Sequence, residues 1–181
     1  EHSDVGKAWC DLMLNYIIGV TSAHGFDGAW NEGAGYGASK LKWLTNASLY
    51  FDTAIQGADL GKNPIYSRIG EFFRRLIPVG MPHHAWGNQR NSMWRNHLFA
   101  FRKLAYLTGD GHFLGNWQEY GGEHFSTFRP WIEYVLPAYY EKPEAKFEEE
   151  FVGFFPIDGW GMAATGPPSH SSTFETGLGF A

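Results

Sequence analysis

The stretch that decides the fold is residues 61–76, Gly-Lys-Asn-Pro-Ile-Tyr-Ser-Arg-Ile-Gly-Glu-Phe-Phe-Arg-Arg-Leu. Asn63 followed by Pro64 is typical of a helix start, because an Asn side chain can cap the first turn and proline needs no N–H there. The apolar residues that follow recur on one helix face: Ile65, Ile69, Phe72, Phe73 and Leu76. This period predicts a helix that buries a single stripe.

The same period extends on both sides of this helix. We expect helices over residues 4–20, 34–57 and 92–107, with shorter helical pieces near 110–119 and 127–140. Ser3 is placed to cap the first, and Pro137 predicts a kink or break in the last, which has Pro130 near its start.

The apolar residues of the three longer helices define their expected faces. In residues 4–20 they are Val5, Ala8, Trp9, Leu12, Tyr16 and Val20. In residues 34–57 they are Leu41, Leu44, Ala47, Tyr50, Phe51 and Ile55. In residues 92–107 the inward positions are Leu98, Phe101, Leu104 and Ala105. Lys40, Lys42 and Lys103 fall between these stripes and are expected to be solvated.

The pattern changes after residue 150. Phe-Val-Gly-Phe-Phe-Pro at 151–156, Gly-Trp-Gly-Met-Ala-Ala at 159–164 and the closing stretch 173–181 lack a helical period and predict short strands. The expected fold class is therefore mainly α. Residues 1–148 would form antiparallel helix pairs of an incomplete α/α toroid, and residues 149–181 would begin a β domain. Since the chain starts at Glu1 rather than Met, we expect an internal piece of a longer protein.

Composition excludes several classes of protein. Apolar residues make up 44% of the 181 residues and charged residues 18%, which is not the composition of a disordered chain. The net charge of −5 argues against a nucleic-acid partner, and no apolar run is long enough to span a membrane. Cys10 is the one cysteine, so neither a disulfide framework nor a multi-cysteine zinc site is expected.

Aromatic residues are abundant, at 18% of the chain with eight Trp. Aromatic and polar side chains that could bind a ligand occur together in residues 26–36, Phe-Asp-Gly-Ala-Trp-Asn-Glu-Gly-Ala-Gly-Tyr. Here Trp30 can stack on a sugar ring, Asn31 and Glu32 bring hydrogen-bonding groups, and Tyr36 enters the first turn of the next helix. The alternative is an ordinary loop whose Trp and Tyr fill the core.

A second polar and aromatic loop spans residues 77–91. We expect His84, Trp86, Asn88 and Arg90 to contact an acidic sugar, on the same rim as the first loop. A purely structural turn remains the alternative. The adjacent pair His83-His84 is a poor metal signal because no third ligand is evident, so no metal is expected. Asn46-Ala47-Ser48 fits the glycosylation pattern but sits in the middle of a helix, where we discount it.

Residues 27–36, Asp-Gly-Ala-Trp-Asn-Glu-Gly-Ala-Gly-Tyr, resemble the signature D-G-x-W-x-E/N-G-x-G-Y of the heparinase II/III and alginate-lyase superfamily. Pro64-Ile65-Tyr66, Gly87-Asn88 and the stretch 154–160 are similar to later features of that family, the last to the entry into its β-sandwich. The resemblance implies β-elimination at a 4-O-linked uronate of alginate or a glycosaminoglycan, with Tyr36 at the position of the catalytic tyrosine.

The same resemblance implies a secreted or periplasmic lyase without a cofactor. Its partners would be an acidic polysaccharide and the rest of the same polypeptide, which would carry the remaining toroid helices, the β-sandwich and the other catalytic groups. Three alternatives stay open: a glycosaminoglycan epimerase, an α/α-barrel glycoside hydrolase using Asp27 and Glu32, and a non-catalytic carbohydrate-binding domain.

Overall fold

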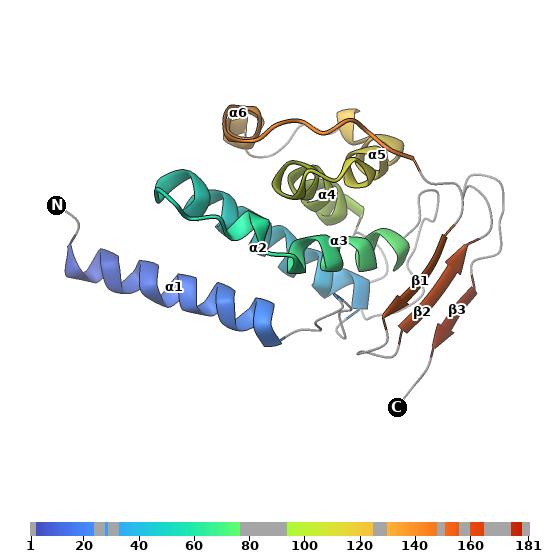
Figure 1. The fold of residues 1–181 in the computed structure, drawn as a ribbon, viewed down its shortest axis with the longest axis horizontal. Helices are drawn as coiled ribbons and strands as arrows, with labels where there is room; N and C mark the ends of the chain where they lie inside the picture. The colour runs from blue at the N-terminus through green and yellow to red at the C-terminus, as the bar shows by residue number, and fades with distance from the viewer. Residues whose placement is uncertain are drawn as a thin grey trace.

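The computed structural model describes residues 3–23, 28, 33–76, 94–124, 130–147, 151–155, 160–164 and 175–178. These residues are mainly helical, as predicted. The helices are α1 (Asp4–Ala23), α2 (Gly33–Ala54), α3 (Ile65–Leu76), α4 (Trp94–Thr108), α5 (Gly111–Glu119) and α6 (Pro130–Tyr139), with short 3-10 turns η1 (Leu60–Lys62) and η2 (Gly122–His124) (Figure 1).

Helix α3 follows the prediction closely. The side-chain oxygen of Asn63 accepts a hydrogen bond from the Ile65 N–H at 3.0 Å, which caps the helix start. The predicted stripe is buried, and Ile65, Ile69, Phe72 and Phe73 are each at most 5% exposed. The side chain of Leu76 lies outside the described residues.

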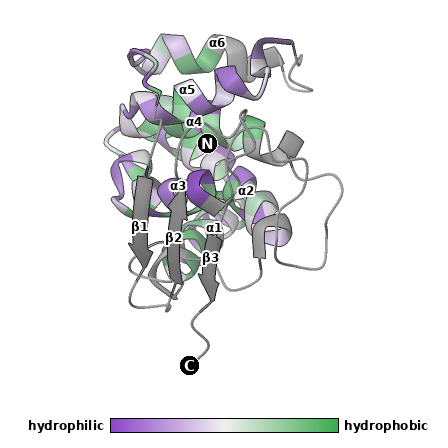
Figure 2. Ribbon diagram, turned by 90° about the vertical axis from the view of Figure 1, so that its right-hand side faces the viewer, coloured by the Kyte–Doolittle hydropathy of each residue, from purple (hydrophilic) through white to green (hydrophobic). Residues whose placement is uncertain are grey.

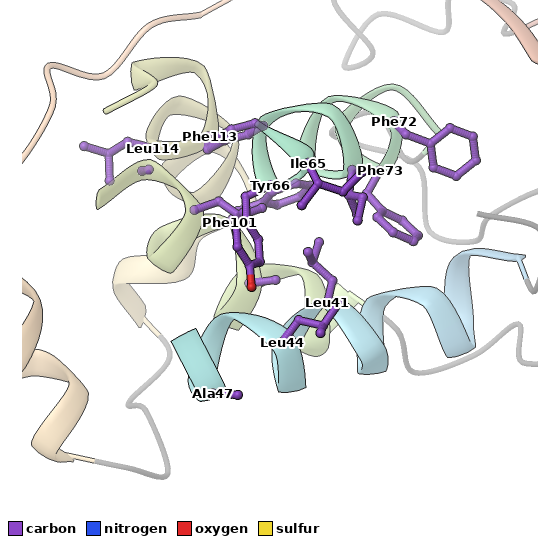
Figure 3. Close-up of a cluster of buried hydrophobic side chains, with 14 of the residues drawn as sticks. Leu41, Leu44, Ala47, Ile65, Tyr66, Phe72, Phe73, Phe101, Phe113 and Leu114 are labelled. Atoms are coloured by element: carbon purple, nitrogen blue, oxygen red, sulfur yellow. The ribbon is translucent and has the colours of Figure 1, made fainter. Parts of the chain in front are cut away.

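The core forms where α3 meets α2, α4 and α5. Figure 3 shows the side chains of this cluster converging from these helices, with Phe101 and Phe113 stacked at 6.2 Å between ring centroids. The predicted inward face of α4 is confirmed, since Leu98, Phe101, Leu104 and Ala105 are at most 2% exposed. Figure 2 shows hydrophobic and hydrophilic residues mixed along the helices, as expected where each helix buries one face.

Contacts between α2 and α4 show that these helices run in the same direction. The Lys42 ammonium lies 5.4 Å from the centroid of the Phe99 ring, and one turn later Lys103 contacts Asn46. Helices α1 and α3 run the opposite way (Figure 1). The end of α1, the start of α2, the end of α3 and the start of α4 therefore lie together, and we call this the rim end of the helical layer.

Three predictions about individual residues need correction. Tyr50 and Ile55 are exposed, at 45% and 44%, because α2 ends at Ala54 and Tyr50 lies on its outer face. Lys103, expected in solvent, is 2% exposed. Helix α6 does not break at Pro137, but continues to Tyr139. Pro137 removes one helical hydrogen bond, and the helix continues for only two further residues.

The apolar stripe predicted on α1 is mostly exposed, although its spacing predicted a buried face. Val5, Trp9, Leu12 and Tyr16 are 65%, 62%, 59% and 46% exposed, whereas Ile17 is 2% exposed. The helix itself is as predicted, with the Ser3 hydroxyl oxygen accepting from the Gly6 N–H at 3.1 Å.

Three antiparallel strands follow the helices at the predicted places: β1 (Phe151–Phe155), β2 (Trp160–Ala164) and β3 (Glu175–Leu178), in the order β1-β2-β3. Phe151 pairs with Ala164, and Trp160 pairs with Leu178. The sheet lies beyond the end of α3 (Figure 1). Whether residues 1–148 and 149–181 are separate domains stays a prediction. None of the described helices is long and apolar enough to cross a membrane.

Candidate functional site at the rim end

Tyr36 lies in the first turn of α2, at the rim end, and its side chain is 45% exposed. It does not fill the core, so the alternative in which this tyrosine is a core residue is wrong. The residues predicted beside it, Trp30, Asn31 and Glu32, lie outside the described residues.

Gly28, from the same motif, packs against helix α3. It is buried with φ at +96°, a conformation that glycine adopts without strain. A Cβ atom at this position would lie 2.6 Å from the Ile69 nitrogen and closer still to the carbonyl group of Arg68. The backbone of Gly28 therefore packs directly against the backbone of α3. The close approach at Gly28 is thus made to the protein's own helix.

The second predicted loop, with His84, Trp86, Asn88 and Arg90, lies outside the described residues. The structure does describe the helix ends that flank it. Helix α3 ends at Leu76 and α4 begins at Trp94, and both of these points lie at the rim end with Tyr36 (Figure 1). That both loops form one rim remains a prediction, because Trp30 and Trp86 themselves are not described.

A charged cluster near the end of α3 was not predicted. The carboxylate of Glu71 accepts hydrogen bonds from Nε and Nη2 of Arg74, at 3.0 and 2.8 Å, and also binds the guanidinium of Arg75. Both arginine side chains are largely buried, at 8% and 15% exposed. The signal was present in the sequence, since Glu71 precedes the two arginines by three and four residues, the spacing of neighbours on a helix.

The charges of this cluster are close to balanced, because the carboxylates of Glu71 and Glu119 both lie near its two guanidinium groups. The nearby Glu119 has its pKa raised by burial, an effect that the charge of Arg74 opposes.

Lys103 forms a second polar contact inside the layer. Its ammonium group donates to the side-chain oxygen of Asn46 at 2.7 Å and to the carbonyl oxygen of Lys42 at 3.1 Å. Asn46 is 9% exposed, which agrees with the expectation that it is not a glycosylation site. These bonds fix α4 against α2, and this contact is structural.

Tyr66, part of the resemblance to the lyase superfamily, is also structural. Its hydroxyl shares a hydrogen bond with the hydroxyl of Ser48, and its side chain is 1% exposed. Burial raises the pKa of Tyr66 to about 12; the bond to Ser48 opposes this shift, and the charge of Asp52 adds to it. A tyrosine so deep and so firmly protonated is a poor candidate for contact with a substrate.

Asp52 closes the end of the layer opposite the rim. Its carboxylate accepts from the N–H groups of Leu60 and Gly61, at 2.7 and 2.9 Å, and from the hydroxyl of Tyr140 at 3.2 Å. Burial, followed by the charge of Asp52, raises the pKa of Tyr140 well above its usual range. Asp52 thus joins α2, η1 and the residue that follows α6.

Among the residues that the structure describes, no three His, Cys, Asp or Glu side chains come together as a metal site would require. Tyr36 with the arginine cluster is thus the strongest chemical feature of the rim end within the described part of the chain. Comparison with models of known protein families and with curated proteins found no match to the chain.

Proposed function

We propose that this chain belongs to a lyase that cleaves a uronic-acid polysaccharide, alginate or a glycosaminoglycan, by β-elimination. The observation that carries the proposal is the placement of Tyr36. The residue that matches the catalytic tyrosine of the resembled superfamily is exposed at the rim end, and Gly28 of the same motif packs on the backbone of α3.

The proposed reaction takes the proton from C5 of the uronate, forms a double bond between C4 and C5, and breaks the bond from C4 to O4. The leaving O4 takes up a proton. Tyr36 is the proton-transfer group contributed by this chain, a role for which its hydroxyl is accessible. Donors aimed at the substrate carboxylate would stabilise the enolate-like charge, usually the largest contribution in such reactions.

Trp30, Asn31 and Glu32, together with His84, Trp86, Asn88 and Arg90, are the proposed sugar contacts. No metal or cofactor takes part in this proposal.

The four helices α1, α2, α3 and α4 alternate in direction and are followed by a sheet. Both features support a place for the chain in an α/α toroid joined to a β-sandwich. Further segments of the same polypeptide would supply the groups that neutralise the carboxylate and complete proton transfer. We propose a secreted or periplasmic location, where such polymers are met.

The test is to incubate the polypeptide that contains this chain with alginate and with glycosaminoglycans in deuterated buffer. A lyase produces new chain ends that absorb in the ultraviolet, because each carries a C4–C5 double bond. New reducing ends without this absorbance would indicate a hydrolase and contradict the proposal. Deuterium entering at C5 without chain cleavage would indicate an epimerase. Binding without any reaction would leave only a carbohydrate-binding domain.

A further inference from the structure

Most of the large apolar side chains that are exposed among the described residues belong to α1 and α2. We define the α1–α2 face by six of them, with their exposed fractions: Val5 (65%), Trp9 (62%), Leu12 (59%), Tyr16 (46%), Trp43 (37%) and Tyr50 (45%). Soluble proteins seldom leave such a set open, and a contiguous apolar surface of this kind usually marks an interface.

These side chains form one continuous surface. Val5, Trp9, Leu12 and Tyr16 are spaced by four, three and four residues, so they lie in a single stripe along α1. The ring of Tyr16 meets the ring of Trp43 edge-on, with centroids 5.3 Å apart, which joins the stripe to α2. Tyr50 follows Trp43 after two turns, on the same side of α2.

The chemistry of the face fits a protein helix. Two of its six side chains, Val5 and Leu12, are aliphatic and offer no flat surface to a sugar ring. The residues that flank the stripe on α1 are uncharged: Gly6, Ala8, Met13 and Asn15. The charged residues of α1, Asp4, Lys7 and Asp11, lie about 110°, 170° and 130° round the helix from the centre of the stripe at 100° per residue. A helix that packs on the stripe of α1 therefore buries none of these charges.

The stripe is complementary to itself. When two copies of α1 lie antiparallel, Val5 falls opposite Tyr16 of the second copy, and Trp9 falls opposite Leu12 of the second copy. Each layer then pairs one aromatic side chain with one smaller aliphatic side chain, which is how facing side chains of different size fill a seam. A two-fold axis repeats both pairings, so the contact closes at two copies.

We infer that the α1–α2 face is a two-fold interface between two copies of this chain. The six side chains offer on the order of 600 Å² of exposed area per copy, taking up to about 200 Å² for each aromatic ring. A standard interface buries about 800 Å² per partner, so this face lies at the low end of what a stable dimer needs, and a weak dimer that depends on concentration is expected. This inference does not depend on the proposed lyase activity.

The test is the mass of the chain in solution, measured by sedimentation equilibrium from low micromolar to near-millimolar concentration. The wild-type chain is expected to pass from monomer to dimer. Trp9→Asp and Leu12→Asp each place a carboxylate in the seam, and each is expected to weaken association by about a hundredfold or more. Circular dichroism and melting at low concentration check that both variants fold, as their exposed positions predict.

Tyr139→Asp is the matched control, since Tyr139 is 61% exposed, like Trp9, but lies on α6. It is expected to dimerise as the wild type does. A wild-type chain that stays monomeric throughout overturns the inference and leaves the face to a different helix, such as another segment of the same polypeptide. Growth beyond two copies also overturns it, as does a dimer that survives both Trp9→Asp and Leu12→Asp.

Discussion

Gly28→Ala tests whether the motif before Tyr36 is held against α3 as the structure shows. The added methyl group would meet the backbone of Arg68 and Ile69, which a helix cannot move aside easily. The positive φ of +96° adds strain of about 1–2 kcal/mol for any residue with a Cβ. Overlap with packed atoms adds about 1–3 kcal/mol. We expect a total loss near 4 kcal/mol and a melting temperature lower by roughly 10 °C.

Gly57→Ala provides the matched control for this prediction. Gly57 has φ at +83°, close to that of Gly28, but a Cβ there would meet nothing within 4 Å. Only backbone strain remains, so we expect a loss of about 1 kcal/mol and a shift of roughly 3 °C. Differential scanning calorimetry of the two variants separates strain from close approach. Equal shifts in the two variants would refute the contact between the motif and α3.

Two further predictions concern the end of the layer opposite the rim. Asp52→Ala leaves two backbone N–H groups and one hydroxyl without their acceptor, and should cost about 2–4 kcal/mol in urea unfolding. Asp59→Ala removes only an exposed ion pair with Lys62 and should cost less than about 1 kcal/mol; equal losses would contradict the role of Asp52. Because the pKa of Tyr66 is raised from 10.0 to about 12 on folding, the stability it contributes is complete below pH 10 and is lost as the pH rises towards 12. Between pH 10 and pH 12, the free energy of unfolding of Tyr66→Phe should therefore fall by about 3 kcal/mol less than that of the wild type. The same pH dependence in both proteins would refute the pKa shift.

Local patterns predicted most of the secondary structure. The start of α3 was signalled by adjacent residues, Asn63 and Pro64, and its buried stripe by a repeat that spans only three turns. The strands after residue 150 followed from the loss of that repeat. Such signals are contained within one element, so a single sequence is enough to show them.

What covers a face is not a local property. The stripe of α1 predicted a helix with an apolar side, but its period is the same whether the partner is this core or a second molecule. Lys103 looked like a solvated position because its acceptor, Asn46, is 57 residues away in the sequence. The hydrogen bond between Asp52 and Tyr140 joins residues 88 positions apart, so no local spacing of residues could predict it.

For the candidate site, too, some features could be predicted from local sequence and others could not. The position of Tyr36 in the first turn of α2 followed from the glycine-rich motif before it. Its exposure and its place at the rim end needed the packing of α1, α3 and α4. The cluster of Glu71, Arg74 and Arg75 has a local signal in the sequence, the spacing of three and four residues between the carboxylate and the two guanidinium groups.

The rate of unsaturated-uronate formation by Tyr36→Phe is the most direct test of the proposed function. The substitution removes only the hydroxyl of a half-exposed ring, so folding should be almost unaffected. If Tyr36 transfers a proton in the transition state, the rate should fall by about 10²–10⁴-fold, or roughly 3–5 kcal/mol in the barrier, with little change in substrate binding.

Tyr50→Phe is the control for this measurement, because Tyr50 lies on the same helix with the same exposed fraction of 45% but far from the rim end. Both variants are measured for melting temperature and rate in the polypeptide that contains this chain. We expect a rate loss in Tyr36→Phe alone, without a matching loss of stability. A Tyr36→Phe variant that cleaves at nearly the wild-type rate would contradict it.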